Sequence, residues 1–522
     1  MKWSSLEQVS SVKSYIILAL IVTAAFAYSL QNSFVWDDYG LIVDNPKIAL
    51  PIREIPTLFI SHLWKIEGAE FRRVYYRPMV MTFHILNYKI WGPNPWGFHL
   101  TNILLHMICV VILYRVGLLL FSTEKLIALI GASVFAVHPV NNEPVGRAAS
   151  GEVIFGFFVI FSLYFFLKEK KYLSWITFFL ALLSKEVAVM MPFALLILTT
   201  HKKGLKKGMF EVIPYAALVG IYLVLRVLFT DTLLGGWVAQ PILTRTFTMA
   251  VATLDYVRLL VIPYPLSAFY PARWYTSIFE PKVLLAALLF ILGLLLAFKI
   301  RKDKAMFFLL IFPFIMLAPV IWRVNTFTAG RDLMYIAERF LYIPALSFSL
   351  FVSAYFVKLT GDARRKYLMI GWVLVIIIFA AITISSNMIW KNNITLFEKI
   401  VEESPNAAFA HQGLGDAYKE IGKLDDAMNH WLKALESDLD NPLILNSVGN
   451  AYYLKGDYNK AINAYKMAIR VFPQMGEVYY NLAITLEKAG RKEEAKVYYK
   501  KFIKLAPESY RGIISELREK GL

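Results

Sequence analysis

Eleven apolar runs constrain this chain of 522 residues more than any other feature. Hydrophobic residues make up 58% of the sequence, and several runs approach the roughly 20 residues with which a helix crosses a bilayer. We therefore expect an all-α, polytopic membrane protein. The predicted spans are 12–30, 98–121, 126–139, 152–168, 172–184, 187–200, 210–229, 281–299, 306–322, 339–357 and 368–387.

Basic residues in short loops orient these spans. Clusters such as KEKK at 168–171 and KIRKDK at 299–304 should remain in the cytoplasm. This places the N-terminus in the cytoplasm, and the first loop, 31–97, and the segment 388–522 on the opposite side. A twelfth span at 246–262 would move KIRKDK at 299–304 to the side opposite the cytoplasm, so we interpret 246–262 as a re-entrant or interfacial helix. A cleavable signal peptide is the weaker reading of the first run, because many spans follow it.

The formal charge of +17 lies entirely in residues 1–400, since residues 401–522 carry equal numbers of basic and acidic side chains. An excess placed in membrane loops argues against nucleic acid as a partner. The single cysteine, Cys109, lies in an apolar run and cannot form an intrachain disulfide. The expected location is the plasma membrane of a prokaryote, or the endoplasmic reticulum if the chain is eukaryotic.

Beyond residue 390 a period of 34 residues replaces the apolar runs. This period is typical of the tetratricopeptide repeat, in which stacked helix pairs bury each other's faces. We expect a partial repeat at 390–404, three repeats over about 406–507, and a capping helix at 508–522. Such an α-solenoid binds an extended peptide or a partner protein. The period joins the aromatic residues Phe397, Trp431, Tyr465 and Tyr499 and the small residues Gly415, Gly449 and Ala483.

Charged and polar side chains gather in the segments that we expect outside. A charge at the bilayer centre costs about 3 kcal/mol on insertion scales, so a group of them on one side indicates a polar cavity at the interface. The adjacent pair Asp37 and Asp38 follows the first span. The other members are Arg72, Arg73, Arg77, His99, Asn102, His106, His138, Glu143, Arg147, Glu152, Lys185, Glu186, Arg331, Asp332, Glu338 and Arg339.

Structural alternatives exist for several of these residues. Either adjacent aspartate could cap a helix, and Lys185 with Glu186 could form an interfacial ion pair. His99 and His106 fit hydrogen bonds between helices better than metal binding. The sequence contains no HExxH, CxxC or Gly-rich phosphate loop, so it gives no support for metalloprotease or nucleotide-driven chemistry.

Several segments, in this order, resemble the transmembrane and tetratricopeptide-repeat proteins, specifically a short, prokaryotic-type member. The resemblance covers essentially the whole chain. It implies a C-type glycosyltransferase fold that transfers mannose from a polyprenyl phosphate to protein hydroxyls. HPVNNEP differs from the family's usual HPVHTEA and the repeat array is short, which leaves the acceptor open. The sugar is open as well, because related enzymes use other lipid-linked sugars. The segments are FVWDDYGLIVDNP, YYRP, FHLTNILLH, FAVHPVNNEPVGRAASGE, LLSKEVAVMMP and AERFLYIPALSF.

The resemblance also implies that a carboxylate of the first outer loop lies beside the acceptor hydroxyl. One base is sufficient for a single displacement with inversion, because a lipid phosphate leaves as an anion without an acid. Glycosidases differ, since their leaving oxygen must be protonated by a second carboxyl group. We predict Asp37 as the base and Asp38 as the neighbour that orients the loop or the sugar; the reverse order stays open.

The remaining site predictions follow from charge. An arginine can bind the oxygens of the leaving phosphate bidentately. No metal or other cofactor is established by the sequence, and a divalent cation held by Glu143 stays open. The predicted phosphate ligands are Arg147 and Arg339, then Arg77 and Lys185, and the predicted contacts to sugar or acceptor are Glu143, His138, Glu338 and Glu186.

Three functions compete at this point. The leading prediction is a polyprenyl-phosphate-sugar-dependent protein O-glycosyltransferase, a mannosyltransferase by resemblance, whose repeats recruit the acceptor or a partner protein. The second keeps the fold but glycosylates a cell-envelope glycan or glycolipid. The third is a non-enzymatic membrane scaffold that presents a peptide-binding solenoid. Carboxylates and arginines from distant outer loops argue against the scaffold.

Overall fold

The computed structural model of the chain describes residues 2–60, 75–122, 124–230, 240–271, 273–322, 327–329, 332–360, 365–506, 510–519 and 521. The chain divides into two compact units, and each is described by itself. The first consists of Met1–Trp64, Arg73–Phe327 and Leu333–Asn392, and the second of Lys65–Arg72, Thr328–Asp332 and Asn393–Leu522.

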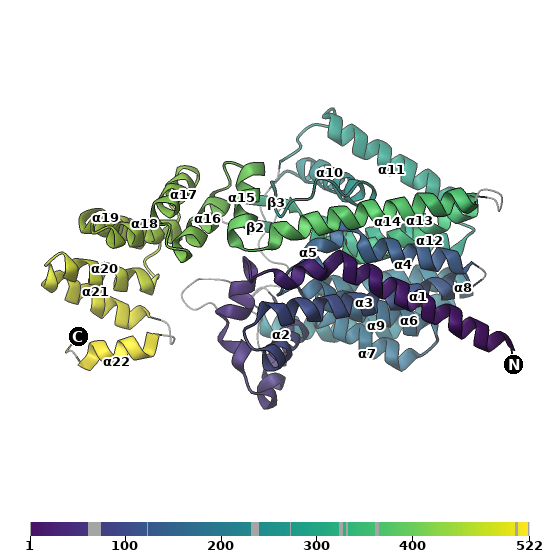
Figure 1. The fold of residues 1–522 in the computed structure, drawn as a ribbon, viewed down its shortest axis with the longest axis horizontal. Helices are drawn as coiled ribbons and strands as arrows, with labels where there is room; N and C mark the ends of the chain where they lie inside the picture. Colours follow the sequence, from purple (N-terminus) through teal and green to yellow (C-terminus); the bar gives the residue numbers. More distant parts are fainter. Residues whose placement is uncertain are drawn as a thin grey trace. The chain divides into compact units, whose positions relative to one another are not determined.

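Helices form most of the first unit (Figure 1), as the sequence predicts. They are α1 Lys2–Phe26, α2 Pro78–Trp91, α3 Pro95–Leu120, α4 Lys125–Val137, α5 Asn142–Gly146, α6 Gly151–Leu167, α7 Lys171–Leu182, α8 Met191–Lys203, α9 Leu205–Phe229, α10 Ile242–Val261, α11 Pro281–Ile300, α12 Lys304–Trp322, α13 Tyr342–Leu359 and α14 Arg365–Asn387. Several begin with proline, whose missing N–H is not required in the first turn.

Short elements connect these helices. Tyr39–Val43 is a single π-helical turn in the first outer loop. β1 Tyr270–Pro271 pairs antiparallel with β3 Asp332–Ile336, with Tyr270 opposite Ile336 and Pro271 opposite Met334; the third strand is β2 Phe327–Ala329. The 3₁₀ helices are Ala27–Gln31, Pro46–Ala49, Ile52–Ile60, Pro139–Asn141, Glu186–Met190, Glu338–Leu341 and Met388–Trp390.

Within the part of the chain that the structure describes, seven helices are long and apolar enough to cross a membrane. A bent pair, Pro139–Gly146 with Gly151–Leu167, could supply an eighth, and three shorter apolar helices complete the set that coincides with the eleven predicted runs. Each shorter helix reaches only about 18–23 Å at 1.5 Å per residue, so it is shorter than the roughly 30 Å hydrocarbon layer. Within the described ranges α10 is not among the candidate spans. The seven long segments are Val12–Gln31, Pro95–Leu120, Leu205–Phe229, Pro281–Ile300, Lys304–Trp322, Glu338–Leu359 and Lys366–Trp390.

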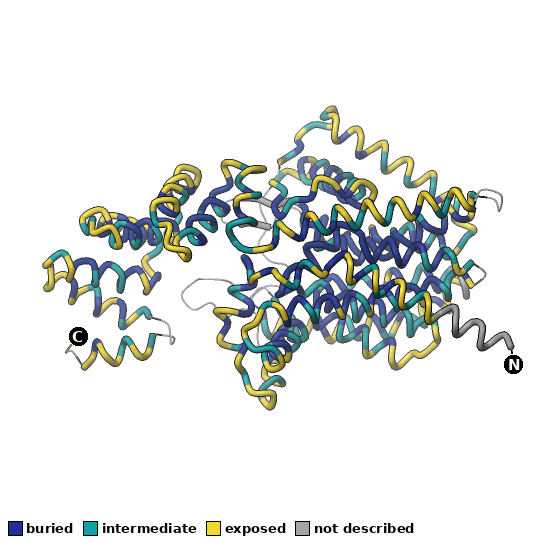
Figure 2. Tube along the Cα trace, in the orientation of Figure 1, coloured by how far each residue is buried: buried dark blue, intermediate teal, exposed yellow. Residues whose placement is uncertain are grey.

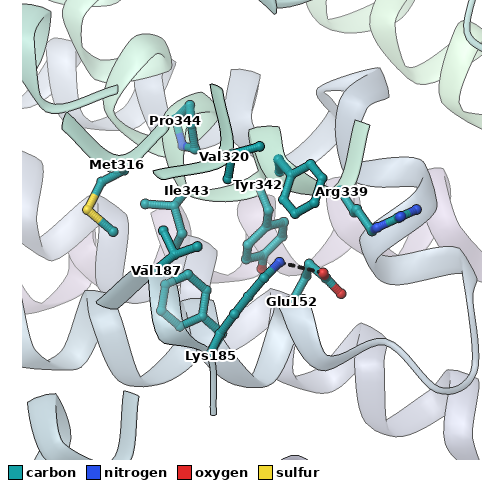
Figure 3. A pocket seen from close by; sticks show the side chains of 11 residues that line it. Glu152, Lys185, Val187, Met316, Val320, Arg339, Tyr342, Ile343 and Pro344 are labelled. Atoms are coloured by element: carbon teal, nitrogen blue, oxygen red, sulfur yellow. Dashed lines mark hydrogen bonds and ion pairs between the residues drawn. The ribbon is translucent and has the colours of Figure 1, made fainter. Parts of the chain in front are cut away.

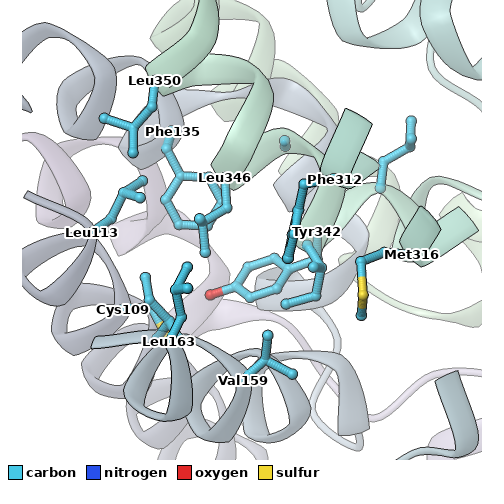
Figure 4. Packing of buried hydrophobic residues seen from close by; sticks show 14 of the residues in the cluster. Cys109, Leu113, Phe135, Val159, Leu163, Phe312, Met316, Tyr342, Leu346 and Leu350 are labelled. Carbon is cyan, nitrogen blue, oxygen red and sulfur yellow. The ribbon is translucent and has the colours of Figure 1, made fainter. Parts of the chain in front are cut away.

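The core of the first unit forms where α3, α4, α6, α12 and α13 pack together. Tyr342, at the start of α13, lies there among Cys109, Leu163 and other buried side chains (Figure 4). Its hydroxyl is 2.9 Å from His106 Nδ1, which is the interhelical hydrogen bond that the sequence favours for this histidine. In contrast, α11 is exposed along most of its length (Figure 2), as a lipid-facing helix should be.

The second unit consists of helix pairs. Its helices are α15 Asn393–Glu403, α16 Ala408–Glu420, α17 Leu424–Ser437, α18 Pro442–Leu454, α19 Tyr458–Val471, α20 Gly476–Lys488, α21 Lys492–Leu505 and α22 Arg511–Glu519. The three pairs α16–α17, α18–α19 and α20–α21 coincide with the three predicted repeats. α15 lies within the predicted partial repeat, and α22 within the predicted capping helix.

The 34-residue frame has a direct steric cause. A Cβ atom at Gly415 would lie 2.5 Å from the Trp431 ring, and one at Gly449 would lie 2.5 Å from the Tyr465 ring. Both rings are at most 1% exposed. A small residue on the first helix of each pair therefore makes room for the aromatic residue on the second.

Candidate active site

The adjacent aspartates stand on a tight loop with an unusual backbone. Trp36 has φ of 49°, in the left-handed region that a bulky residue rarely adopts. The loop is closed by Asp38, whose N–H donates to the Val35 carbonyl at 2.9 Å and whose carboxylate accepts the Val35 N–H at 3.0 Å. Trp36 and this closure turn consecutive side chains to different surroundings.

Asp38 is fully buried and has both carboxylate oxygens occupied by backbone donors. The second oxygen accepts the N–H of Ala149 at 2.9 Å, which ties the loop to the segment between α5 and α6. Burial raises the pKa of Asp38 above its ordinary value, against the lowering effect of Arg147 and of the two backbone N–H groups. Asp38 therefore holds the loop in place.

Asp37 has the opposite environment. Its side chain is 43% exposed, and its Oδ2 lies 3.1 Å from Nη2 of Arg147, which is only 7% exposed. Asp37 thus offers an accessible carboxylate oriented by a buried cation.

Asp37 opens onto a cavity of about 170 Å³. Its wall combines charged groups with an apolar side, as a site for an amphipathic ligand requires. Among the described residues, four cations line it, each on a different segment of the first unit: Arg77, Arg147, Lys185 and Arg339. The acidic lining residues are Asp37, Glu152 and Glu186, and the apolar ones include Leu41, Val80, Val187, Pro319, Val320 and Phe340.

Glu143 joins two of these cations from behind. Its Oε1 lies 2.5 Å from Nη1 of Arg339 and 3.4 Å from Nη1 of Arg147, and its Oε2 accepts the Arg339 N–H at 2.9 Å. The Glu143 side chain is only 3% exposed and is not among the residues that line the cavity. Its position fits holding the two arginines, and its predicted contact to sugar or acceptor stays a prediction.

The other two cations form separate pairs. Arg77 binds Glu186 bidentately, with N–O distances of 3.1 and 2.9 Å. Lys185 Nζ lies 2.6 Å from Glu152 Oε1, at the edge of a small adjoining apolar pocket (Figure 3). Glu186, predicted to contact sugar or acceptor, therefore lines the cavity as the partner of Arg77.

Two predicted contact residues lie away from the cavity wall. His138 is fully buried, with Nε2 at 3.0 Å from the Leu260 carbonyl. Glu338 accepts hydrogen bonds from the Ser267 N–H at 2.8 Å and from the Tyr270 hydroxyl at 2.7 Å. Both connect α10 and its following loop to neighbouring segments. Arg72, Arg73, Arg331 and the side chain of Asp332 lie outside the described part of the chain.

The structure adds residues for which the sequence predicts no role. Glu152 lines the cavity and pairs with Lys185. Tyr75 also lines it, with the Arg77 guanidinium 4.4 Å from its ring centroid. Asn102 donates to the Arg147 carbonyl at 2.7 Å. The FHLTNILLH and GRAASGE segments pointed to Asn102 and Glu152. Tyr75 lies in the YYRP segment of the resemblance, from which only Arg77 was singled out.

The arrangement offers one accessible carboxylate beside several cations in a partly apolar cavity. That combination suits proton removal from a hydroxyl next to a bound phosphate. Across the described ranges, no three His, Cys, Asp or Glu side chains are grouped as a metal site would require.

These features define the class: an all-α membrane protein with a tetratricopeptide solenoid. Models described as "TPR repeat" match residues 415–456 and 449–490, and one described as "Tetratricopeptide repeat" matches residues 476–509. The chain is also homologous over most of its length to proteins named protein O-mannosyl-transferase.

Three such relatives show the extent of the similarity. Protein O-mannosyl-transferase TMTC3 of Homo sapiens is 25% identical over 97% of this chain and 62% of its own length. TMTC1 of Homo sapiens is 25% identical over 94% of this chain and 62% of its own length, and F38B6.6 of Caenorhabditis elegans is 24% identical over 82% and 63%. The chain thus spans about three fifths of the length of these relatives.

Similarity to solved structures covers a much smaller part. A crystal structure of MamA matches with a TM-score of 0.22 and 24% identity, over 24% of this chain and 77% of that one. The first tetratricopeptide repeat of Spaghetti (RPAP3), bound to an HSP90 peptide, matches with a TM-score of 0.21 and 20% identity, over 22% and 94%.

Proposed function

We propose that this chain is an inverting glycosyltransferase that moves a sugar from a polyprenyl-phosphate donor to a hydroxyl of a protein acceptor. The observation that carries the proposal is the accessible Asp37 carboxylate, which is ion-paired to Arg147 in a cavity lined by four cations. The names of the full-length relatives favour mannose as the sugar and protein as the acceptor.

In the proposed reaction Asp37 accepts the proton of the acceptor hydroxyl as its oxygen attacks the anomeric carbon. The bond between that carbon and the phosphate oxygen breaks at the same time, and its electron pair leaves on the lipid phosphate. Attack from the opposite face inverts the anomeric configuration. Asp38, with both oxygens used by backbone N–H groups, keeps Asp37 in position.

The cations are arranged to stabilise the leaving phosphate. Arg339 lines the cavity and also pairs with Glu143, which lies outside the cavity wall. Its guanidinium can therefore donate hydrogen bonds to a phosphate while Glu143 fixes its position. Arg147 shares Glu143 but also binds Asp37, so it links the base to the phosphate site. Lys185 and Arg77 add charge at the same wall. The apolar side formed by Pro319, Val320 and Phe340 suits the start of the lipid chain.

The proposed orientation follows the basic loops. The N-terminus lies in the cytoplasm, and the site and the repeats lie on the extracytoplasmic side. The repeats then share a compartment with the site and recruit the acceptor or a partner protein to it.

A direct assay tests the function. Purified protein is incubated with polyprenyl-phosphate mannose and a protein acceptor, and the anomeric configuration of the product is read by NMR. Transfer with inversion supports the proposal. Retention of configuration, or transfer only from a soluble nucleotide sugar, overturns it.

The phosphate site yields a separate prediction. Arg339→Ala should weaken donor binding by about 10- to 100-fold, because a charge-assisted hydrogen bond contributes about 1.5–3 kcal/mol. Arg273→Ala is the matched control, since Arg273 pairs with Glu280 and its side chain is 73% exposed. Donor titration of both variants measures the difference. Equal donor affinity in the two variants would contradict the assignment of Arg339.

A further inference from the structure

The last candidate span, Lys366–Trp390, ends beside the candidate active site. Trp390, the final residue of that span, is only 3% exposed. The guanidinium carbon of Arg147 lies over its ring, 5.7 Å from the ring centroid. The same guanidinium forms an ion pair with Asp37, so the Trp390 ring contacts the cation that orients the accessible carboxylate.

The segment around Trp390 also holds the loop that carries Asp37. The N–H of Ser33 donates to the Lys391 carbonyl at 2.9 Å, and the side-chain amide of Asn32 donates to the Asn387 carbonyl at 3.2 Å. The amide of Asn387 donates in turn to the Ala25 carbonyl at 3.1 Å, at the end of α1. Residues 387–391 therefore lie behind the start of the aspartate loop.

A third contact reaches the helix that precedes Arg147. A Cβ atom added at Gly146 would lie 3.0 Å from Oδ1 of Asn387, so the end of α5 packs closely on the end of α14. The segment 387–391 thus touches the loop before Asp37, the backbone before Arg147 and the Arg147 side chain. These contacts come from three different parts of the chain and converge on one ion pair.

We propose that Trp390 is a positioning residue, which fixes the Arg147 guanidinium and, through it, the Asp37 carboxylate. This inference rests on the proposed function, because it assigns Trp390 an effect on proton transfer from the acceptor hydroxyl. The flat ring limits where the guanidinium can move and attracts it electrostatically. A base displaced by about 1 Å can lose on the order of 100-fold in rate, so Trp390 acts on turnover without contacting substrate.

Three variants separate positioning from simple packing. Trp390→Ala removes the ring, and Trp390→Phe keeps an aromatic face beside Arg147. Trp372→Ala is the matched control, because Trp372 is a buried tryptophan of α14, 9% exposed, that packs on Phe356 and lies 18 residues before Trp390 in the same candidate span.

Two measurements are made on each purified full-length variant. The first is kcat and donor KM for sugar transfer. The protein concentration used for kcat is that of the monodisperse fraction in size-exclusion chromatography. The second is amide hydrogen exchange over residues 33–38, where Val35 and Ser33 donate the hydrogen bonds described above. We expect Trp390→Ala to lower kcat by at least about 10-fold with donor KM within about threefold, and to speed exchange over residues 33–38. Trp390→Phe should stay within about threefold of wild type, and Trp372→Ala should match wild type in both measurements.

The inference is overturned if the Trp390→Ala and Trp372→Ala variants lose kcat equally, if donor KM rises as much as kcat falls, or if exchange over residues 33–38 is unchanged in Trp390→Ala. An absence of transfer by the wild-type protein is a different result: it contradicts the proposed function. In that case the exchange comparison alone decides whether Trp390 holds the loop.

Discussion

One backbone conformation gives two adjacent aspartates different surroundings. The positive φ of Trp36 precedes Asp37, which reaches the cavity, and Asp38, which turns back onto Val35 and Ala149. Holding a tryptophan in this conformation costs on the order of 1 kcal/mol or more, and the two backbone hydrogen bonds to Asp38 offset that cost. Such strain is typical of sites where a side chain must point in a set direction.

The asymmetry predicts distinct effects of two conservative substitutions. Asp37→Asn should leave stability and donor binding intact but lower turnover by about 100-fold or more, because the amide cannot accept the proton. Asp38→Asn should cost about 1–3 kcal/mol of stability, since one of its two backbone N–H partners then faces an NH₂ group. Turnover and thermal unfolding, measured on the same preparations, separate the two. A helix-cap role for Asp37 would instead give normal turnover in Asp37→Asn.

The sequence predicted this pair because two carboxylates follow a membrane span, but it could not show which one is accessible. That depends on the Ala149 N–H and on Arg147, both more than 100 residues away in the chain. Glu143 shows the same limit, since its acidic type suggested a sugar contact, whereas its place between two arginines comes from tertiary packing. Charge type is readable from sequence, and the choice of partner is not.

At the scale of elements, periodic packing was the readable signal. The 34-residue frame predicted the helix pairs because a small residue must face a large aromatic one in each pair. The membrane helices were readable as apolar runs, because each turn of a spanning helix faces either lipid or the protein core and therefore carries apolar side chains. The bend of 111° between Pro139–Gly146 and Gly151–Leu167 was not readable, because the polar contacts of Arg147 and Asp38 at the break come from distant segments.

The repeat frame predicts a steric penalty. Gly449→Ala should destabilise the α18–α19 pair by about 1–2 kcal/mol, because the new Cβ would overlap the buried Tyr465 ring by more than the gain in helix propensity can offset. Gly512→Ala, in α22 with no atom within 4 Å of its Cβ position, should be neutral or slightly stabilising. Chemical denaturation followed by far-UV circular dichroism measures both. Equal stability of the two variants would count against the packing origin of the frame.

Asp416 should make the first repeat sensitive to pH. Burial raises its pKa from 3.8 to about 6, against the hydrogen bond from Trp431 Nε1 at 3.0 Å. Between pH 3.8 and pH 6 the folded state therefore binds more protons than the unfolded state. The contribution of Asp416 to the free energy of unfolding is fully present below pH 3.8 and is lost as pH rises through 6. Asp416→Asn keeps an acceptor for Trp431 and removes the penalty, which is at most about 3 kcal/mol at neutral pH.

Hydrogen-exchange protection factors for α16 and α17 in the full chain, at pH 4 and pH 7, measure this effect. Wild type should lose protection at pH 7, and Asp416→Asn should be nearly flat. Asp425→Asn is the control, because its side chain is 91% exposed. A wild-type profile that does not change between the two pH values would contradict the buried-carboxylate argument.

For the whole molecule, the chain joins a membrane domain to a repeat domain through a very short connection. The last candidate span ends at Trp390, and the first helix of the repeat unit begins at Asn393. Under the proposed function, the repeats that follow this span bind the acceptor. Binding energy from such a remote contact contributes to the reaction only when that acceptor is present.

Deletion of residues 406–522 should therefore separate acceptor recognition from donor chemistry. We expect transfer to a full protein acceptor to fall by about 10-fold or more, whereas transfer to water, measured as hydrolysis of the lipid-linked donor, stays within about twofold. Transfer to a short soluble acceptor peptide that is too small to contact the repeats should, like donor hydrolysis, change by no more than about twofold on deletion. Membrane insertion of the truncated chain is checked first by its elution as a single detergent-solubilised species. If donor hydrolysis and protein transfer fall equally in a properly inserted protein, the repeats support the membrane domain structurally and do not recruit the acceptor.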